Sequence, residues 1–161
     1  MESAAALTGA FLVGVASGGR SATGLAAVAL TTRPGTPAAV LDRAASTPGR
    51  ALLSAGAAVE LVIDKLPSTP SRLSPPNLAG RLVAGAAGGA ALALRARSHP
   101  GLGALCGAAG AVAGSYAGAL WRRWAGTDKV NAVTAAIAED LLTVATAVAA
   151  CTIAPQRPTS A

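Results

Sequence analysis

Aromatic residues are almost absent from this chain of 161 residues, at 2% of its composition, and charged residues are scarce, at 12%. A typical soluble domain carries about twice this share of charge, and its core relies on the large aromatic side chains missing here. Apolar residues make up 52% of the sequence, and 19 glycines accompany them. Small residues form weak cores in water but allow close helix packing in lipid. The composition therefore predicts an all-α membrane protein, with an alanine-rich soluble bundle as the alternative.

Histidine and cysteine are also rare, with a single histidine and two cysteines, Cys106 and Cys151. Both cysteines lie in apolar stretches and neither belongs to a CxxC pair. We therefore interpret them as small buried side chains and expect neither a metal site nor a cofactor. The N-terminus has no basic region of the kind that begins a signal peptide, so we expect the first apolar stretch to remain as a membrane segment.

Basic residues outnumber acidic ones by 13 to 7. No basic run is interleaved with aromatic residues, so we expect no nucleic-acid partner and assign the excess to the loops beside the membrane. Six basic residues fall on each side of the predicted spans, so the positive-inside rule does not decide the orientation. The lipid bilayer is the partner that the composition predicts.

Charge-free stretches divide the chain into predicted helices. Residues 98–121 contain no Lys, Arg, Asp or Glu, which is the clearest spanning signal in the sequence. The first apolar stretch is interrupted by a charge at Gly18-Gly19-Arg20-Ser21, so it either breaks into two halves or continues as one tilted helix. Residues 1–154 thus form a single transmembrane helical domain of about five spans, and residues 155–161 are expected to be a disordered tail. The remaining predicted helices cover residues 48–65, 77–96 and 128–153.

A glycine-zipper stripe marks the helix predicted between residues 98 and 121. Its glycines recur at a spacing of four, which presents a flat face to a neighbouring helix or to a second copy of the chain. A homo-oligomer is therefore compatible with the sequence. The glycines of the stripe are Gly103, Gly107, Gly110, Gly114 and Gly118.

Carboxylates inside the predicted spans are the main functional candidates. Glu139 and Asp140 fall at the centre of the last predicted helix, where a charge costs on the order of 2.5–3.5 kcal/mol. We therefore expect at least one of them to face the protein interior near a cation. Arg20 is the countercharge in reach, paired with Glu139 or Glu60. Arg81, which follows two prolines, is expected to snorkel to the interface.

Three interpretations of this polar site stay open. It is a structural cluster, or a site for proton- or cation-coupled permeation, or an anion site formed by Arg20 with the amides of Gly19, Ser21 and Ala22. An enzyme is not expected, because no nucleophile and base occur at a recognisable spacing. The candidate site comprises Arg20, Ser21, Glu60, Asp64, Lys65, Thr69, Ser71, Arg72, Arg81, Glu139 and Asp140.

Several phrases of the sequence are similar to a known family. They are residues 19–26 (GRSATGLA), 64–72 (DKLPSTPSR), 80–86 (GRLVAGA) and the pair Glu139-Asp140. Over residues 5–150 the chain resembles the bacterial membrane family catalogued as domain of unknown function 4126. The resemblance implies a multi-pass protein of the bacterial inner membrane and assigns no activity to any residue.

The sequence therefore favours an integral membrane protein that moves or senses a small solute or ion through a polar site in its helix bundle. The alternative is a membrane scaffold or assembly factor that transports nothing. A carrier needs polar groups that face a water-accessible cavity, whereas a scaffold needs those groups to be fully paired.

Overall fold

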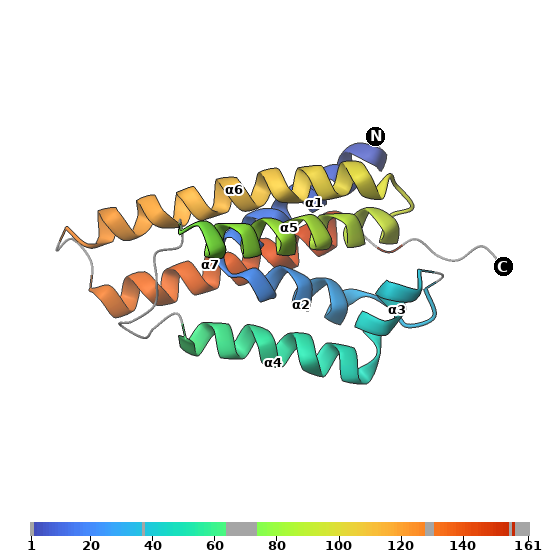
Figure 1. Ribbon diagram of the computed structural model, residues 1–161, viewed down its shortest axis with the longest axis horizontal. Coiled ribbons are helices and arrows are strands. Elements are labelled where there is room, and N and C mark those ends of the chain that lie inside the picture. The colour runs from blue at the N-terminus through green and yellow to red at the C-terminus, as the bar shows by residue number, and fades with distance from the viewer. Residues whose placement is uncertain (1, 37, 64–73, 128–130, 155, 157–161) are drawn as a thin grey trace.

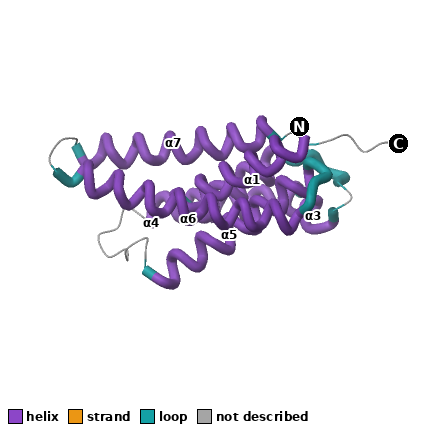
Figure 2. The backbone as a smooth tube through the Cα atoms, turned by 90° about the horizontal axis from the view of Figure 1, so that it is seen from above, coloured by secondary structure: helices purple, strands orange, loops and turns teal. Residues whose placement is uncertain are grey.

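The computed structural model describes residues 2–36, 38–63, 74–127, 131–154 and 156. The regular structure of these residues is helical throughout, as predicted (Figure 2). The long helices lie side by side along one axis (Figure 1). The helices are α1 (Glu2–Gly19), α2 (Ser21–Thr31), α3 (Ala39–Ala45), α4 (Thr47–Ile63), α5 (Pro75–Arg95), α6 (Pro100–Ala125) and α7 (Ala132–Ile153).

Three of the described helices are long and apolar enough to cross a membrane, and they lie in Pro75–Arg95, Pro100–Ala125 and Val133–Ile153. Two shorter apolar helices, Ala4–Gly19 and Ser21–Thr31, precede them. The bundle is thus that of a membrane protein, although the first apolar stretch does not form a single full-length span.

The first apolar stretch folds into a helical hairpin. Arg20 lies between α1 and α2 in an extended conformation (φ −146°, ψ 118°), which ends the first helix and reverses the chain. The second helix returns alongside the first, so that a Cβ added at Gly24 would lie 2.8 Å from the carbonyl oxygen of Val13. The N-terminus and the start of α3 consequently lie at the same end of the bundle (Figure 1). The predicted break at Arg20 is confirmed, and the tilted continuous helix is wrong.

The hairpin occupies the centre of the bundle, and α4 lies at its edge. Helix α1 packs against α2, α5, α6 and α7, and its face with Ala6, Ala10, Val13 and Ser17 is fully buried. Helix α4 packs chiefly on α2 and α3. The bundle therefore surrounds the tip of the hairpin, where α1 ends and α2 begins, with α4, α5, α6 and α7.

Glycines let α6 lie directly against the backbones of its neighbours. Added Cβ atoms at Gly103 and Gly107 would overlap carbonyl oxygens of α5, and those at Gly110 and Gly114 would overlap carbonyl oxygens of α1. Gly118, the last glycine of the predicted stripe, is half-buried. This close approach holds α6 between α1 and α5.

Side-chain caps mark the starts of two helices. Helix α7 begins at Ala132 rather than at residue 128, because the side chain of Asn131 accepts a hydrogen bond from the Val133 amide (2.9 Å) and caps the helix. Thr127 donates its hydroxyl to the Trp124 carbonyl at the end of α6 (2.6 Å). Helix α4 is capped by Ser46, whose hydroxyl accepts from the Gly49 amide at 3.2 Å.

Of the expected tail, only Gln156 is described. Its side-chain oxygen accepts a hydrogen bond from the Arg33 amide at 2.6 Å, which ties this residue to the α2–α3 connection.

Candidate functional site

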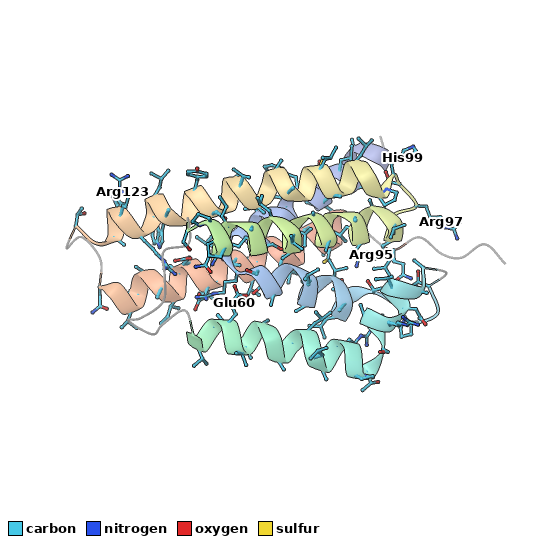
Figure 3. All side chains as sticks on the ribbon, in the orientation of Figure 1. Glu60, Arg95, Arg97, His99 and Arg123 are labelled. Atoms are coloured by element: carbon cyan, nitrogen blue, oxygen red, sulfur yellow. The ribbon has the colours of Figure 1, made fainter. Side chains whose placement is uncertain are left out.

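The N-terminus of α2 binds a carboxylate of the same chain. The amides of Ser21 and Ala22 donate to the two carboxylate oxygens of Glu60, at 2.7 and 2.8 Å. Glu60 reaches them from the end of α4 (Figure 3). The first amides of a helix have no partner within the helix, and the helix dipole favours a negative charge there. The anion site considered from the sequence is therefore filled by a side chain.

The C-terminus of α1 is capped by a buried cation. Arg81 of α5 is only 4% exposed and donates to the carbonyl oxygens of Gly18 and Gly19, the latter at 2.8 Å. The Ser115 hydroxyl also donates to the Gly18 carbonyl at 3.3 Å. The prediction that Arg81 snorkels to the interface is wrong, since the broken helix exposes carbonyl groups that attract a donor into the interior.

Arg20 itself pairs with Asp140. Its Nε donates to Asp140 Oδ1 at 2.9 Å, and its Nη2 donates to the same oxygen. The two side chains are 4% and 18% exposed. We had expected Glu139 or Glu60 to take this position. Asp140 takes it because α7 packs against both α1 and α2 and turns this residue toward the tip.

Glu139 pairs with a different arginine. Arg122 of α6 lies with its Nε 3.3 Å from Glu139 Oε2, and the two side chains are 45% and 11% exposed. Successive helical residues point about 100° apart, so Glu139 and Asp140 meet different neighbours. The prediction that at least one of them faces the interior near a cation is confirmed by Asp140, which meets Arg20, whereas Glu139 meets Arg122 of α6.

A cavity of about 550 Å³ opens beside this second pair. Among the residues that the structure describes in its wall, Arg20, Arg122 and Glu139 are charged, and the others are largely apolar. A second cavity of about 180 Å³, called the inner cavity below because it borders the central helix α1, opens between α1, α6 and α7. Trp121 and Glu139 line both cavities and so mark the boundary between them.

Two side-chain interactions join α6 and α7 at this boundary. One is the Arg122–Glu139 pair, and the other is a hydrogen bond from Trp121 Nε1 to the Ala135 carbonyl at 3.1 Å. The two helices otherwise make few contacts with each other. The Trp121 ring also lies against that of Trp124, with ring centroids 5.2 Å apart.

The opposite end of the bundle repeats the pattern of arginines on helix ends. Arg95, 3% exposed, donates to the Cys151 and Ala154 carbonyl oxygens at the end of α7, at 2.8 and 2.6 Å. Arg50 donates to the Thr32 carbonyl oxygen after α2 at 2.7 Å. By contrast, Arg97 and Arg123 point away from the bundle (Figure 3).

Four of the predicted site residues lie together at the tip, namely Arg20, Ser21, Glu60 and Arg81. Asp140 and Glu139 approach them from α7. Sequence reasoning missed Trp121 and Arg122 as site residues. It also missed the hydroxyls that follow Glu139 on α7, although their spacing of three and four positions was readable as one helix face.

The remaining predicted site residues lie outside the described part of the chain. They are Asp64, Lys65, Thr69, Ser71 and Arg72.

Within the described residues, no group of three or more His, Cys, Asp or Glu side chains is arranged to hold a metal ion. No protein-family model, curated protein or solved structure matches the chain. The resemblance drawn from the sequence therefore stays a prediction, and the function must be argued from the cavities and the charges beside them.

Proposed function

We propose that the chain is a multi-pass protein of the bacterial inner membrane that binds a small solute or ion in the larger cavity and carries it along the bundle. The observation that carries this proposal is the cavity of about 550 Å³ with Arg20, Arg122 and Glu139 in its wall. Its volume falls in the range of about 300–1,000 Å³ that is usual for small-molecule sites.

The position of the cavity supports transport over simple binding. It extends from the end of the bundle where α6 stops and α7 begins to the tip of the α1–α2 hairpin, where Arg20 forms part of the cavity wall. Broken helices whose ends meet inside the bundle are typical of the substrate sites of secondary transporters. Charged side chains within spans are expensive in lipid and are retained where they face a water-filled path.

A membrane scaffold is the second candidate, and the tip itself favours it. Glu60 and Arg81 each bind a helix end, and Arg20 binds Asp140. Such groups hold helices in register without any ligand. The Arg122–Glu139 pair beside the cavity is not accounted for in this way, since the Arg122 side chain is 45% exposed.

The two candidates separate in proteoliposomes. Purified protein is reconstituted, and uptake is followed by light scattering for a panel of alkali, ammonium, chloride, acetate and glycerol gradients. Ala136 lines the cavity, whereas Leu141 of the same helix is 66% exposed on the outer face. We expect uptake of at least one solute, its loss in Ala136→Trp, and its retention in Leu141→Trp.

If the wild-type protein takes up no solute of the panel, the result supports the scaffold. Equal uptake by both tryptophan variants contradicts a path through this cavity.

A further inference from the structure

The inner cavity is lined by a different set of polar groups from those of the larger cavity. Its volume of about 180 Å³ corresponds to roughly six water molecules at about 30 Å³ each. Apart from Trp121 at the boundary, the polar side chains of its described wall come from α7: Glu139, Thr143 and Thr146. These residues are four and three positions apart, so they share one face of the helix.

Each side-chain N–H or O–H donor in the described wall of this cavity is already used. The Thr143 hydroxyl donates to the Glu139 carbonyl at 2.9 Å, and the Thr146 hydroxyl donates to the Leu142 carbonyl at 2.7 Å. Trp121 Nε1 donates to Ala135. A hydroxyl has one donor and two acceptor lone pairs, so both threonine oxygens remain available only as acceptors. The cavity thus offers oxygen acceptors beside a carboxylate.

We infer that the inner cavity binds a compact monovalent cation, an alkali metal ion or ammonium, on the Glu139 carboxylate and the hydroxyl oxygens of Thr143 and Thr146. This inference rests on the proposed function, in which the cation is the solute itself or the ion coupled to it. Hard oxygen ligands suit such cations. An anion would need donors, which these side chains have already committed. A divalent ion usually takes more carboxylates than the single one found among the described residues of this wall.

Arg122 is an internal competitor for this cation. Its guanidinium lies 3.3 Å from Glu139 on the side of the larger cavity. A cation that arrives at Glu139 from the inner side replaces part of this interaction. Removal of the arginine charge should therefore strengthen cation binding, by about fivefold or more. A purely structural role for the Arg122–Glu139 pair does not produce this gain.

Cation binding can be followed through Trp121, which borders the site. The chain has two tryptophans, so Trp124→Phe leaves Trp121 as the single emitter. This protein, purified in detergent, is titrated with NaCl, KCl and NH₄Cl at an ionic strength held constant with choline chloride. The thermal midpoint is recorded at each salt, because a ligand of the native state raises it.

We expect a saturable fluorescence change and a raised midpoint with at least one of the three salts, and neither with choline. Thr143→Val and Thr146→Val should each weaken binding about tenfold, and Glu139→Gln should abolish it. Thr152→Val is the matched control, since Thr152 is exposed on the same helix and its hydroxyl donates to Ala149 in the same manner (2.8 Å). It should bind as the parent does. Arg122→Gln should bind more tightly.

The inference is overturned if no salt changes either signal, if choline acts equally, or if Thr146→Val binds like Thr152→Val. Thr146 is half-buried, so this comparison stands even where Thr143→Val fails to fold. If the protein takes up an anion or a neutral solute but binds no cation, the proposed transport is supported and the cation site is contradicted. If the protein binds a cation but takes up no solute, the cation site is supported and the proposed transport is contradicted.

Discussion

Two arginine–carboxylate pairs involve adjacent residues of α7, and yet they differ in exposure, in the distance between the charged groups and in location. Arg20 and Asp140 are 4% and 18% exposed, with Nε and Oδ1 2.9 Å apart. Arg122 and Glu139 are 45% and 11% exposed, and the closest atoms are 3.3 Å apart. The first pair lies at the tip of the hairpin, where Arg20 also forms part of the wall of the larger cavity, and the second lies between the two cavities.

This comparison shows that the position of a charged side chain around its helix, rather than its residue type, decides whether it stabilises the fold or faces a cavity. The tip pair is packed against helix ends that are capped by other side chains, so the loss of either partner leaves a buried charge. The cavity pair has an exposed arginine, and pairs of that kind contribute little to stability. We therefore assign stability to the first pair and ligand binding to the second.

Breaking the tip pair should have the largest effect. Arg20→Gln and Asp140→Asn should each lower the free energy of unfolding by about 3–5 kcal/mol, since each leaves one buried charge uncompensated. The double variant should recover part of the loss, because no lone charge remains. Denaturation in detergent micelles measures all three. A double variant as unstable as the sum of the single ones would show that the two side chains act independently.

Glycine packing provides a test of whether the tip depends on the helices that surround it. A Cβ at Gly107 would overlap the Gly85 carbonyl oxygen, so Gly107→Ala should cost about 1–3 kcal/mol. Gly80 on α5 has nothing within 4 Å of an added Cβ, so Gly80→Ala should be neutral or stabilising by up to about 1 kcal/mol. Thermal midpoints compare the two variants. Equal midpoints would make the close contacts of α6 energetically unimportant.

The carboxylate on the N-terminus of α2 should contribute less. Glu60→Gln keeps an oxygen acceptor but loses the charge, so we expect a loss of about 1 kcal/mol. The effect should be local, because α4 packs chiefly on α2 and α3. Hydrogen exchange should therefore rise in α2 and α4 while that of α6 stays unchanged. A uniform rise over the whole bundle would mean that Glu60 supports the global fold.

The smallest expected change in stability concerns the cavity pair. Arg122→Gln should alter the free energy of unfolding by less than about 1 kcal/mol, since the arginine is half-exposed. The same denaturation assay measures it beside Arg20→Gln. A loss as large as that of Arg20→Gln would make both pairs structural and favour the scaffold.

The sequence predicted the elements of this fold better than their mutual positions. Two glycines followed by Arg20 marked the position of a possible break, because glycine weakens a helix and a charge is costly in a span, but they left a tilted continuous helix as the alternative. Nothing in the sequence says that α2 turns back along α1. The carbonyl groups that draw Arg81 inward are therefore visible only in the folded hairpin.

The choice between Glu139 and Asp140 could not be predicted for a related reason. One residue rotates a side chain by about 100°, and the rotation of α7 is set by its packing on α1 and α2. The sequence predicted only that at least one of the two carboxylates meets a cation. Which cation each one meets, and whether a cavity lies beside it, depends on contacts between helices far apart in the sequence.

The most direct test compares the neighbouring carboxylates in one measurement, the thermal midpoint with and without a saturating concentration of the bound cation. We predict that Asp140→Asn has a lowered midpoint but keeps the cation-induced rise, because its inner cavity is intact. Glu139→Gln should keep a midpoint close to that of the wild-type protein without added cation and should lose the rise. If both variants lose stability and both keep or both lose the cation-induced rise, the division between a structural pair and a ligand-binding pair is contradicted.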